Sequence, residues 1–369
     1  MAPLVHALRN HTDIRLKVCV TAQHREMLDQ VLDMFSIRAD YDLSIMQPGQ
    51  DLYDLTARLL LELKQVYHQE RPDLVLVHGD TTTTMAVSLA SYYARIPVGH
   101  VEAGLRTRDK FQPFPEEVNR QVTGVLADLH FAPTERAKQN LLDEAVPGDR
   151  VFVTGNTVID ALLKVHDSVI HDENVHKQMV LLYPWLEKYN RMILVTGHRR
   201  ENFGRGFKEI CEALVELARM YPDVSIVYPV HLNPEVCAPV DSILRAAGAQ
   251  NVFLIEPVDY ASFVYLLDRC YLVLTDSGGV QEEAPSLGKP VVVMRETTER
   301  PEAVEAGTAI LAGNSRKKIM ESVTRLLDDR DWYSSMSQAM NPYGDGHAAE
   351  RIAKTVVRYL IAEDKPFSG

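Results

Sequence analysis

The sequence is poor in cysteine and has no long apolar run. Its 369 residues include four widely separated cysteines, and no two of them form a C-x-x-C pair; they are Cys19, Cys211, Cys237 and Cys270. This spacing argues against a disulfide framework or a zinc site and is typical of reduced thiols in a cytoplasmic protein. No apolar segment approaches the length that spans a membrane, and the N-terminus does not show a signal-peptide pattern.

Positive charge is scarce as well. The formal net charge of −12 argues against nucleic acid or an anionic membrane as a partner. An anionic ligand would therefore have to be bound by a local group of Arg, Lys and helix N-termini. Because the sequence has no Walker A motif, no G-x-G-x-x-G and no H-E-x-x-H, it predicts no metal, ATP or nicotinamide cofactor.

What the sequence does contain is a regular alternation of short apolar strands and longer helical segments. Strands are predicted at 16–21, 41–45, 74–77, 97–101, 129–132 and 151–153, and again at 192–196, 225–230, 252–255, 271–274, 291–294 and 309–311. Alternation of this kind is typical of parallel, doubly wound α/β sheets. A chain of this length also exceeds one typical hydrophobic core.

The alternation is interrupted once, over a stretch at about residues 168–190 that is polar and irregular enough to contain the linker. We therefore predict an N-terminal Rossmann-like domain over 1–168 and a C-terminal one over 169–347. A last helix within 348–369 is expected to return to the first domain. In such a pair the carboxyl ends of both sheets would face a common cleft, which is where open α/β sheets bind ligands.

The stretch from Tyr271 to Pro290 is the most informative. A buried strand is followed by the turn Thr275-Asp-Ser-Gly-Gly279, and a helix is predicted from about Val280. Ser277, Gly278 and Gly279 would then lie at the helix N-terminus, where free amides and the helix dipole favour a phosphate. One turn later Glu283 is suited to a sugar hydroxyl. The alternative is an ordinary strand-to-helix turn.

Charged residues also follow the predicted strands of the first half. Asp80 and Glu102 each come directly after a strand, and Glu116 and Arg120 share one face of the next helix. Asp80 could equally be a helix N-cap, and Glu116–Arg120 an ordinary surface ion pair. In the second half, the loop that begins at His198 is rich in Arg and Gly, which suggests anion binding rather than a solvated loop.

Several strings together resemble the bacterial non-hydrolysing UDP-N-acetylglucosamine 2-epimerases. They are His78-Gly-Asp-Thr-Thr-Thr-Thr84, His100-Val-Glu-Ala-Gly-Leu-Arg106, Pro115-Glu-Glu117 with Asn119-Arg120, Thr196-Gly-His-Arg-Arg-Glu201, Thr275-Asp-Ser-Gly-Gly-Val-Gln-Glu-Glu-Ala284 and Thr298-Glu-Arg-Pro301. The resemblance extends over almost the whole chain, in order. It implies two Rossmann-like domains of the glycosyltransferase B type and a cytoplasmic homodimer that supplies surface polysaccharide synthesis.

The resemblance also implies the chemistry: UDP-N-acetylglucosamine and UDP-N-acetylmannosamine are interconverted, without cofactor or metal, by elimination and re-addition of UDP through a 2-acetamidoglucal. The implied catalytic residues are Asp80, Glu102, Glu116 and His198, and those implied in substrate binding are Arg120, Phe263, Ser277, Gly278, Gly279, Glu283 and Arg300. Which carboxylate is the base and which the acid stays open. A glycosyltransferase of the same fold, or a truncated UDP-sugar-binding form with little activity, are the alternatives.

Two features depart from the family pattern. The family begins with a strand that ends in a Gly-Thr-Arg-Pro-Glu loop, whereas this chain begins with the predicted helix Met1-Ala-Pro-Leu-Val-His. We therefore expect backbone groups of the neighbouring strands to lack this partner, and a chain that begins at Met1 to be poorly stable and little active. The second departure is Val258, which stands where the family usually has a Gln near the nucleotide.

Overall fold

The structure is a computed structural model, and it describes residues 1–21, 25–47 and 49–363. The predicted start of one helix at His24 and the end of the predicted last segment, 364–369, lie outside the described residues. The chain forms two compact units, Met1–Ala161 with Tyr343–Gly369, and Leu162–Pro342. The domain boundaries that the sequence predicts, at residues 168 and 347, stay predictions.

Unit 1 is built on parallel strands. Its elements are α1 (Ala2–Arg9), β1 (Cys19–Val20), α2 (Arg25–Met34), β2 (Tyr41–Asp42), α3 (Leu52–Glu70), β3 (Val75–His78), α4 (Thr82–Ala94), β4 (Val98–Val101), α5 (Glu116–Leu126), β5 (Leu129–Ala132), α6 (Glu135–Asp143), η1 (Gly148–Arg150), β6 (Val151–Val153) and α16 (Ala348–Glu363). Strands β3 to β6 form one sheet in chain order, and β1 pairs with β2 in a second, two-stranded sheet.

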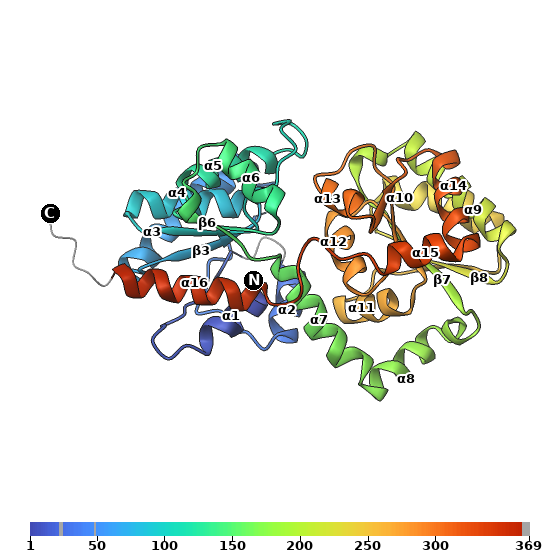
Figure 1. Ribbon diagram of the computed structural model, residues 1–369, viewed down its shortest axis with the longest axis horizontal. Helices are drawn as coiled ribbons and strands as arrows, with labels where there is room; N and C mark the ends of the chain where they lie inside the picture. Colours follow the sequence, from blue (N-terminus) through green and yellow to red (C-terminus); the bar gives the residue numbers. More distant parts are fainter. Residues whose placement is uncertain (22–24, 48, 364–369) are drawn as a thin grey trace. The chain divides into compact units, whose positions relative to one another are not determined.

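Helices cover the four-stranded sheet of unit 1 on both faces (Figure 1). On one face α1 and α16 bury Leu4, Leu8 and Ile352 against Phe131 of β5. Each side chain buried in this way contributes roughly 1.5–3 kcal/mol. Helices α4 and α5 lie on the other face, and α3 packs beside α4. The last helix is therefore part of unit 1, although the chain reaches it only after passing through unit 2.

Unit 2 contains a six-stranded parallel sheet. Its elements are α8 (Glu173–Leu182), η2 (Pro184–Glu187), β7 (Arg191–Thr196), η3 (Arg200–Asn202), α9 (Arg205–Met220), β8 (Val224–Pro229), α10 (Pro234–Pro239), η4 (Val240–Arg245), β9 (Val252–Ile255), α11 (Tyr260–Arg269), β10 (Leu272–Thr275), α12 (Gly278–Ser286), β11 (Val291–Val293), α13 (Pro301–Glu305), β12 (Ala309–Leu311), α14 (Arg316–Asp328) and α15 (Arg330–Ser337); α7 (Thr157–Ile170) crosses the boundary between the units.

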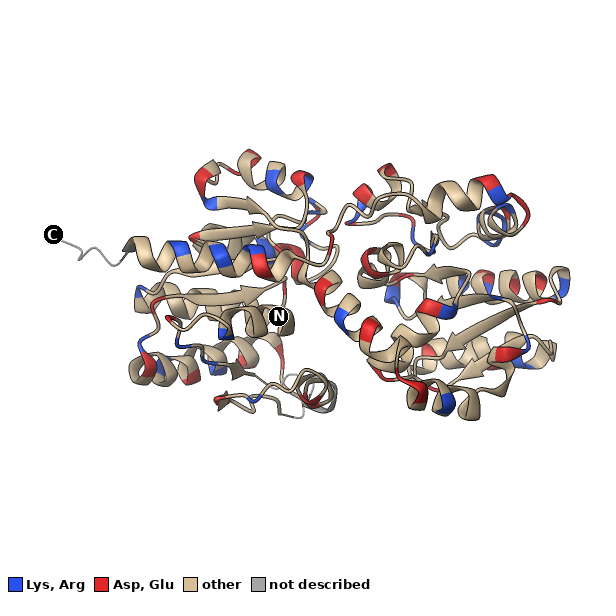
Figure 2. Cartoon of the chain, turned by 60° about the horizontal axis from the view of Figure 1, so that its bottom comes forward, with Lys and Arg blue, Asp and Glu red and all other residues tan. Residues whose placement is uncertain are grey.

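The strand order in unit 2 is β12-β11-β10-β7-β8-β9. The order reverses between β7 and β10, so their carboxyl ends border the crevice in which doubly wound sheets bind ligands. The strands are almost entirely uncharged, and most of the Lys, Arg, Asp and Glu residues are on helices and loops (Figure 2). Buried apolar strands are typical of a parallel sheet covered on both faces. The prediction of two parallel, Rossmann-like α/β halves is confirmed.

Three local predictions were wrong. The stretch 168–190 is not an irregular linker, because α7 continues to Ile170 and α8 and η2 follow it. Helix α8 was missed because, among its residues, Met179 is the buried side chain, so it has almost no apolar periodicity. Helix α15 was missed because only Asp329 separates it from α14. Helix α12 begins at Gly278, two residues before the predicted start.

No helix in the described part of the chain is both long enough and apolar enough to cross a membrane.

Candidate functional site

Two of the predicted carboxylates lie at adjacent strand ends in unit 1. Asp80 follows β3 after Gly79, and Glu102 follows β4 directly, and these two strands pair in parallel. The carboxyl ends of paired parallel strands meet at one edge of the sheet, so the two side chains come together there. They are partly shielded from solvent, with 31% of the Asp80 side chain and 13% of the Glu102 side chain exposed.

Arg120 joins these two carboxylates. Its Nη2 donates to Oδ2 of Asp80 and, over 3.1 Å, to Oε1 of Glu102, and its Nη1 donates to the carbonyl of Glu102. The Arg120 side chain is only 5% exposed. Hydrogen bonds between a guanidinium and carboxylates are charge-assisted and are stronger than those between neutral groups. Arg120 is therefore not the solvated partner of an ordinary surface ion pair.

Glu116 is one turn before Arg120 on the same face of α5, at the first position of the helix. Its Oε2 atom is buried and has no hydrogen-bond partner. Buried polar atoms are ordinarily hydrogen-bonded, and a catalytic role is one reason why such an atom stays unpaired. Arg120 thus relates the three predicted carboxylates: it donates hydrogen bonds to Asp80 and Glu102, and Glu116 is one turn before it on α5.

The loop that carries Asp80 is fixed by side chains that the sequence did not single out. Asn119 donates its amide to the carbonyl of Asp80 over 3.0 Å, and Nε2 of His100 lies 2.8 Å from the carbonyl of Gly79. Burial lowers the pKa of His78 to about 4 and that of His100 well below its ordinary value, so both rings are neutral at pH 7.

Glu102 has an unusual backbone conformation. Its φ angle is 63°, in the left-handed region that residues with a Cβ rarely adopt. Such strain persists only where the surroundings impose it, and it is common at functional sites. Gly79 leaves room for the carboxylate: a Cβ there would lie 3.3 Å from Oε1 of Glu102.

In unit 2 the predicted residues gather at the switch point of the sheet. Thr196 and Thr275 are register partners at the ends of β7 and β10. His198 follows the first of these strands and Ser277 the second. The side chain of Asp276 accepts hydrogen bonds from the backbone of His198 and Arg199 over 3.0 and 2.9 Å.

His198 is held close to a buried carboxylate. Asp276 is fully buried, and its Oδ1 is 3.7 Å from Nδ1 of His198. Burial lowers the pKa of His198 although Asp276 opposes the shift, and Arg199 adds to it. The imidazole is therefore neutral at pH 7 and can accept or donate a hydrogen bond. Arg205, in contrast, is the first residue of α9, and 92% of its side chain is exposed.

Helix α12 begins at Gly278, and the amide of the preceding Ser277 donates to the hydroxyl of Thr275 over 2.9 Å. Ser277 is its N-cap residue and makes no side-chain capping bond, and nothing lies within 4 Å of the position that a Cβ of Gly279 would take. The guanidinium of Arg300 lies directly over Gly278, where a Cβ would collide with it. Arg300 is in turn paired with Glu282 at 2.5 Å and Glu299 at 2.7 Å. A cation beside a helix N-terminus is suited to a phosphate.

Glu283 is buried on the same helix. Tyr260 donates its hydroxyl to Oε1 of Glu283 over 2.6 Å, and burial raises the pKa of Glu283 to about 7 despite that bond. Besides the bond from Tyr260, the carboxyl oxygens of Glu283 offer acceptor sites for a further hydroxyl group. Phe263 is half-buried on α11, the helix that carries Tyr260. Asp276, the partner of His198, is part of the string 275–284 that resembles the family, so the sequence could have pointed to it. Nothing in the sequence points to Tyr260, the partner of Glu283.

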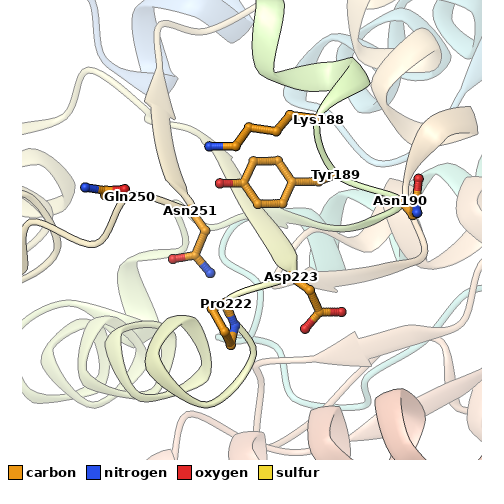
Figure 3. Close-up of a pocket in the computed structure, with 7 residues that line it drawn as sticks. All are labelled: Lys188, Tyr189, Asn190, Pro222, Asp223, Gln250 and Asn251. Atoms are coloured by element: carbon orange, nitrogen blue, oxygen red, sulfur yellow. The ribbon is translucent and has the colours of Figure 1, made fainter.

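A pocket of about 530 Å³ opens at the opposite end of the same sheet (Figure 3). Its residues precede strands instead of following them: Asn190 comes before β7, Asp223 before β8 and Asn251 before β9. None of the predicted site residues lines it. In the part of the chain that the structure describes, no three His, Cys, Asp or Glu side chains are grouped as metal ligands would be.

Comparison with known proteins identifies what the chain is similar to. Residues 6–357 match the family model described as UDP-N-acetylglucosamine 2-epimerase. The chain is 59% identical over 361 residues to the UDP-N-acetylglucosamine 2-epimerase of Yersinia pestis, covering 98% of this chain and 96% of that protein. It is 60% identical over 362 residues to the enzyme of that name from Escherichia coli (strain K12), with the same coverage.

Solved structures agree. The UDP-GlcNAc 2-epimerase from Neisseria meningitidis, in a crystal structure bound to UDP-GlcNAc, has a TM-score of 0.92 and 52% sequence identity, covering 97% of this chain and 96% of that one. The UDP-GlcNAc 2-epimerase from Methanocaldococcus jannaschii, in complex with UDP-GlcNAc and UDP, has a TM-score of 0.81 and 33% identity, covering 97% and 95%.

Proposed function

The chain belongs to the UDP-N-acetylglucosamine 2-epimerase family, and from this premise we propose that it converts UDP-N-acetylglucosamine reversibly to UDP-N-acetylmannosamine. The observation that carries the proposal is the pair of strand-end carboxylates, Asp80 and Glu102, joined by Arg120. Proton transfer by carboxylates of this kind is what inversion at a sugar carbon requires. The relatives of that name cover nearly the whole chain.

The chemistry explains why several carboxylates are needed. The C2–H bond of the sugar has no neighbouring ring carbonyl to stabilise a carbanion, so we propose elimination. One group removes the C2 proton, the bond from C1 to UDP breaks, and a 2-acetamidoglucal forms. UDP then adds back to C1 while a proton is delivered to the other face of C2. We assign this proton transfer to Asp80, Glu102 and Glu116, without assigning base and acid among them.

Holding the departing UDP is the second requirement, and we assign it to the switch-point residues of unit 2. We propose that the backbone at Ser277, Gly278 and Gly279, together with the guanidinium of Arg300, binds the pyrophosphate. We propose that Glu283 binds the ribose and that Phe263 lies near the uracil. His198, neutral at pH 7, is proposed to hydrogen-bond a phosphate or sugar oxygen during the reaction.

Conversion in both directions tests this proposal. The purified chain is incubated with UDP-N-acetylglucosamine in one tube and UDP-N-acetylmannosamine in another, and both are followed by NMR. We expect both tubes to reach the same ratio of the two sugars without an added acceptor. A product that forms only with an acceptor would indicate a transferase, and UDP binding without conversion would indicate a binding protein; either result would contradict the proposal.

We also propose a homodimer, as the resemblance implies. A row of exposed apolar side chains on α5 supports it: Val118, Val122 and Val125 are spaced i, i+4 and i+7 on one face, with 38%, 36% and 86% exposed. On the neighbouring helix α4, Tyr93 is 69% exposed. Contiguous exposed apolar surface of this kind marks protein–protein contacts, and we assign it to a second copy of this chain.

For the cellular role, we propose that the product supplies surface polysaccharide synthesis in the cytoplasm. The four cysteines are all free thiols, and Cys19 is exposed. Free, exposed thiols are typical of a reducing compartment.

A further inference from the structure

The carboxylate of Glu102 is held by two different donors. Oε1 accepts from Arg120 at 3.1 Å, and Oε2 accepts from the side-chain amide of Asn156 at 3.0 Å. The backbone of Glu102 is in the left-handed region and continues no helix or strand. The orientation of the carboxylate therefore depends on the side chains that reach it.

Asn156 is itself fixed in place. It is 1% exposed, its backbone N–H donates to the carbonyl of Tyr343 over 2.7 Å, and its Oδ1 accepts from the N–H of Val158 over 3.4 Å. One side-chain rotamer thus satisfies both ends of the amide. The oxygen accepts a hydrogen bond from the first turn of α7, and the nitrogen donates one to Glu102. A different rotamer would leave buried polar atoms unpaired.

The surroundings of Asn156 are the segments by which the chain leaves unit 1 after Ala161 and re-enters it at Tyr343. These segments touch through backbone: a Cβ on Gly155, whose φ is 83°, would lie 3.2 Å from Cα of Gly344. The carboxylate of Asp160 accepts from the amides of Ala348 and Ala349 at the start of α16, over 3.2 and 2.8 Å. The amide of Asn156 therefore projects from a rigid junction.

We propose that Asn156 is a positioning residue for Glu102: its amide orients the carboxylate and favours the ionised form during proton transfer at C2. The inference rests on the proposed function. Other groups also face Glu102, namely Arg120, with Asp80 on its far side, together with the His78 ring and the amino group of Met1. The amide donates to Oε2 of Glu102, whereas the guanidinium of Arg120 donates to Oε1.

Two substitutions test the proposal. Asn156→Ala removes the donor, and Asn156→Asp keeps the volume and the acceptor for Val158 but places a carboxylate oxygen against Glu102. We expect kcat to fall about tenfold to a hundredfold in both, because a hydrogen bond to a charged group is lost, with KM changed less than about threefold. The limb of the pH–rate profile that reports Glu102 should move to higher pH, whether it acts as base or as acid.

Asn251 provides the matched control. It is a buried asparagine in unit 2, and its amide donates to the backbone carbonyls of Ala218, Tyr221 and Val224. Asn251→Ala removes a buried amide of the same kind, so Tm should fall while both limbs of the pH profile stay in place. A purely structural role for Asn156 would give the same pattern.

The outcomes separate the two proposals. If the wild-type chain does not interconvert the sugars, the proposed function fails; if it does and both Asn156 variants keep wild-type kcat and pH limbs, only this inference fails. A readout in the wild-type protein covers the case of variants that do not fold. The side-chain amide NMR signal of Asn156 should titrate with the midpoint of one kinetic limb, and a signal that stays constant across that limb would overturn the proposal.

Discussion

Glu116 differs from the other two candidate carboxylates because its buried Oε2 atom has no hydrogen-bond partner. Glu116→Gln should therefore lower kcat by about a hundredfold or more, as expected for loss of a general acid or base, while Tm changes by no more than about 2 °C. Steady-state kinetics and thermal unfolding of the same preparation measure both quantities.

Glu135 is the control for that substitution. It has the same position in α6 that Glu116 has in α5, the first residue of the helix, but its side chain is 80% exposed. Glu135→Gln removes the same charge from a helix N-terminus and should leave kcat unchanged. A Glu116→Gln enzyme with near-normal turnover would remove Glu116 from the chemistry.

The buried Glu283 makes stability depend on pH. Its pKa is raised from 4.5 to about 7 by burial, so the folded chain binds a proton in a range where the unfolded chain has released it. Its contribution is present below about pH 4.5 and is lost as pH rises through 7, by up to roughly 3 kcal/mol. Glu283→Gln should remove this dependence. The free energy of unfolding in urea, taken as variant minus wild type, should therefore be more positive at pH 8 than at pH 5.

The same pH dependence of unfolding in both proteins would show that Glu283 does not titrate in this range. Gln keeps an oxygen for the hydroxyl of Tyr260, so the comparison changes the ionisable group and little else.

At the residue scale, the sequence could predict the positions of side chains that directly follow a strand. Asp80 and Glu102 come directly after paired strands, so topology alone brings them to one edge. It could not predict that Asn156 contacts Glu102, 54 residues away, or that Tyr260 contacts Glu283. Those contacts depend on the exact crossing of loops and helices, which leaves no periodic pattern in the sequence.

At the scale of elements, the start of α12 offers a comparison within one helix. A Cβ at Gly278 would collide with the Arg300 guanidinium and lie 3.1 Å from Oε1 of Glu299, whereas one at Gly279 would meet nothing within 4 Å. We expect Gly278→Ala to lower Tm and to weaken UDP binding about tenfold or more, because Arg300 must move. Gly279→Ala should keep or raise Tm, because alanine favours the helix by roughly 0.5–1 kcal/mol.

Thermal unfolding and calorimetric titration with UDP measure both effects. Equal Tm values for the two glycine variants would contradict the packing of Arg300 against Gly278.

The exposed face of α5 makes a second prediction at this scale. Val125→Glu places a charge in the row of apolar side chains and should shift the chain from dimer to monomer, as measured by analytical ultracentrifugation. Leu181→Glu, at a leucine of α8 that is also 80% exposed, is the matched control and should leave the mass unchanged. A Val125→Glu protein that stays dimeric would exclude this face as the interface.

Elements were predictable where burial imposes a pattern. The strands of unit 2 are continuous apolar runs because both faces of the sheet are covered, and their sequence shows it. Helices α8 and α15 were not predictable, since one buries little apolar surface and the other follows α14 after a single residue. The early start of α12 could not be predicted because two glycines are poor helix formers.

At the scale of the whole molecule, each of the two units carries one group of the proposed site residues. Carboxylates gather at the strand ends of unit 1, and the open helix N-terminus lies at the switch point of unit 2. The sequence predicted two α/β halves from the repeated alternation of strands and helices.

The central claim is that side chains of unit 1 exchange the hydrogen on C2 of the sugar while UDP leaves and returns. Conversion of UDP-N-acetylglucosamine in deuterated water tests it most directly, with NMR at C2 of the first UDP-N-acetylmannosamine formed. We predict deuterium at C2 of the product and at no other carbon. Product that retains its original hydrogen at C2 would contradict the account.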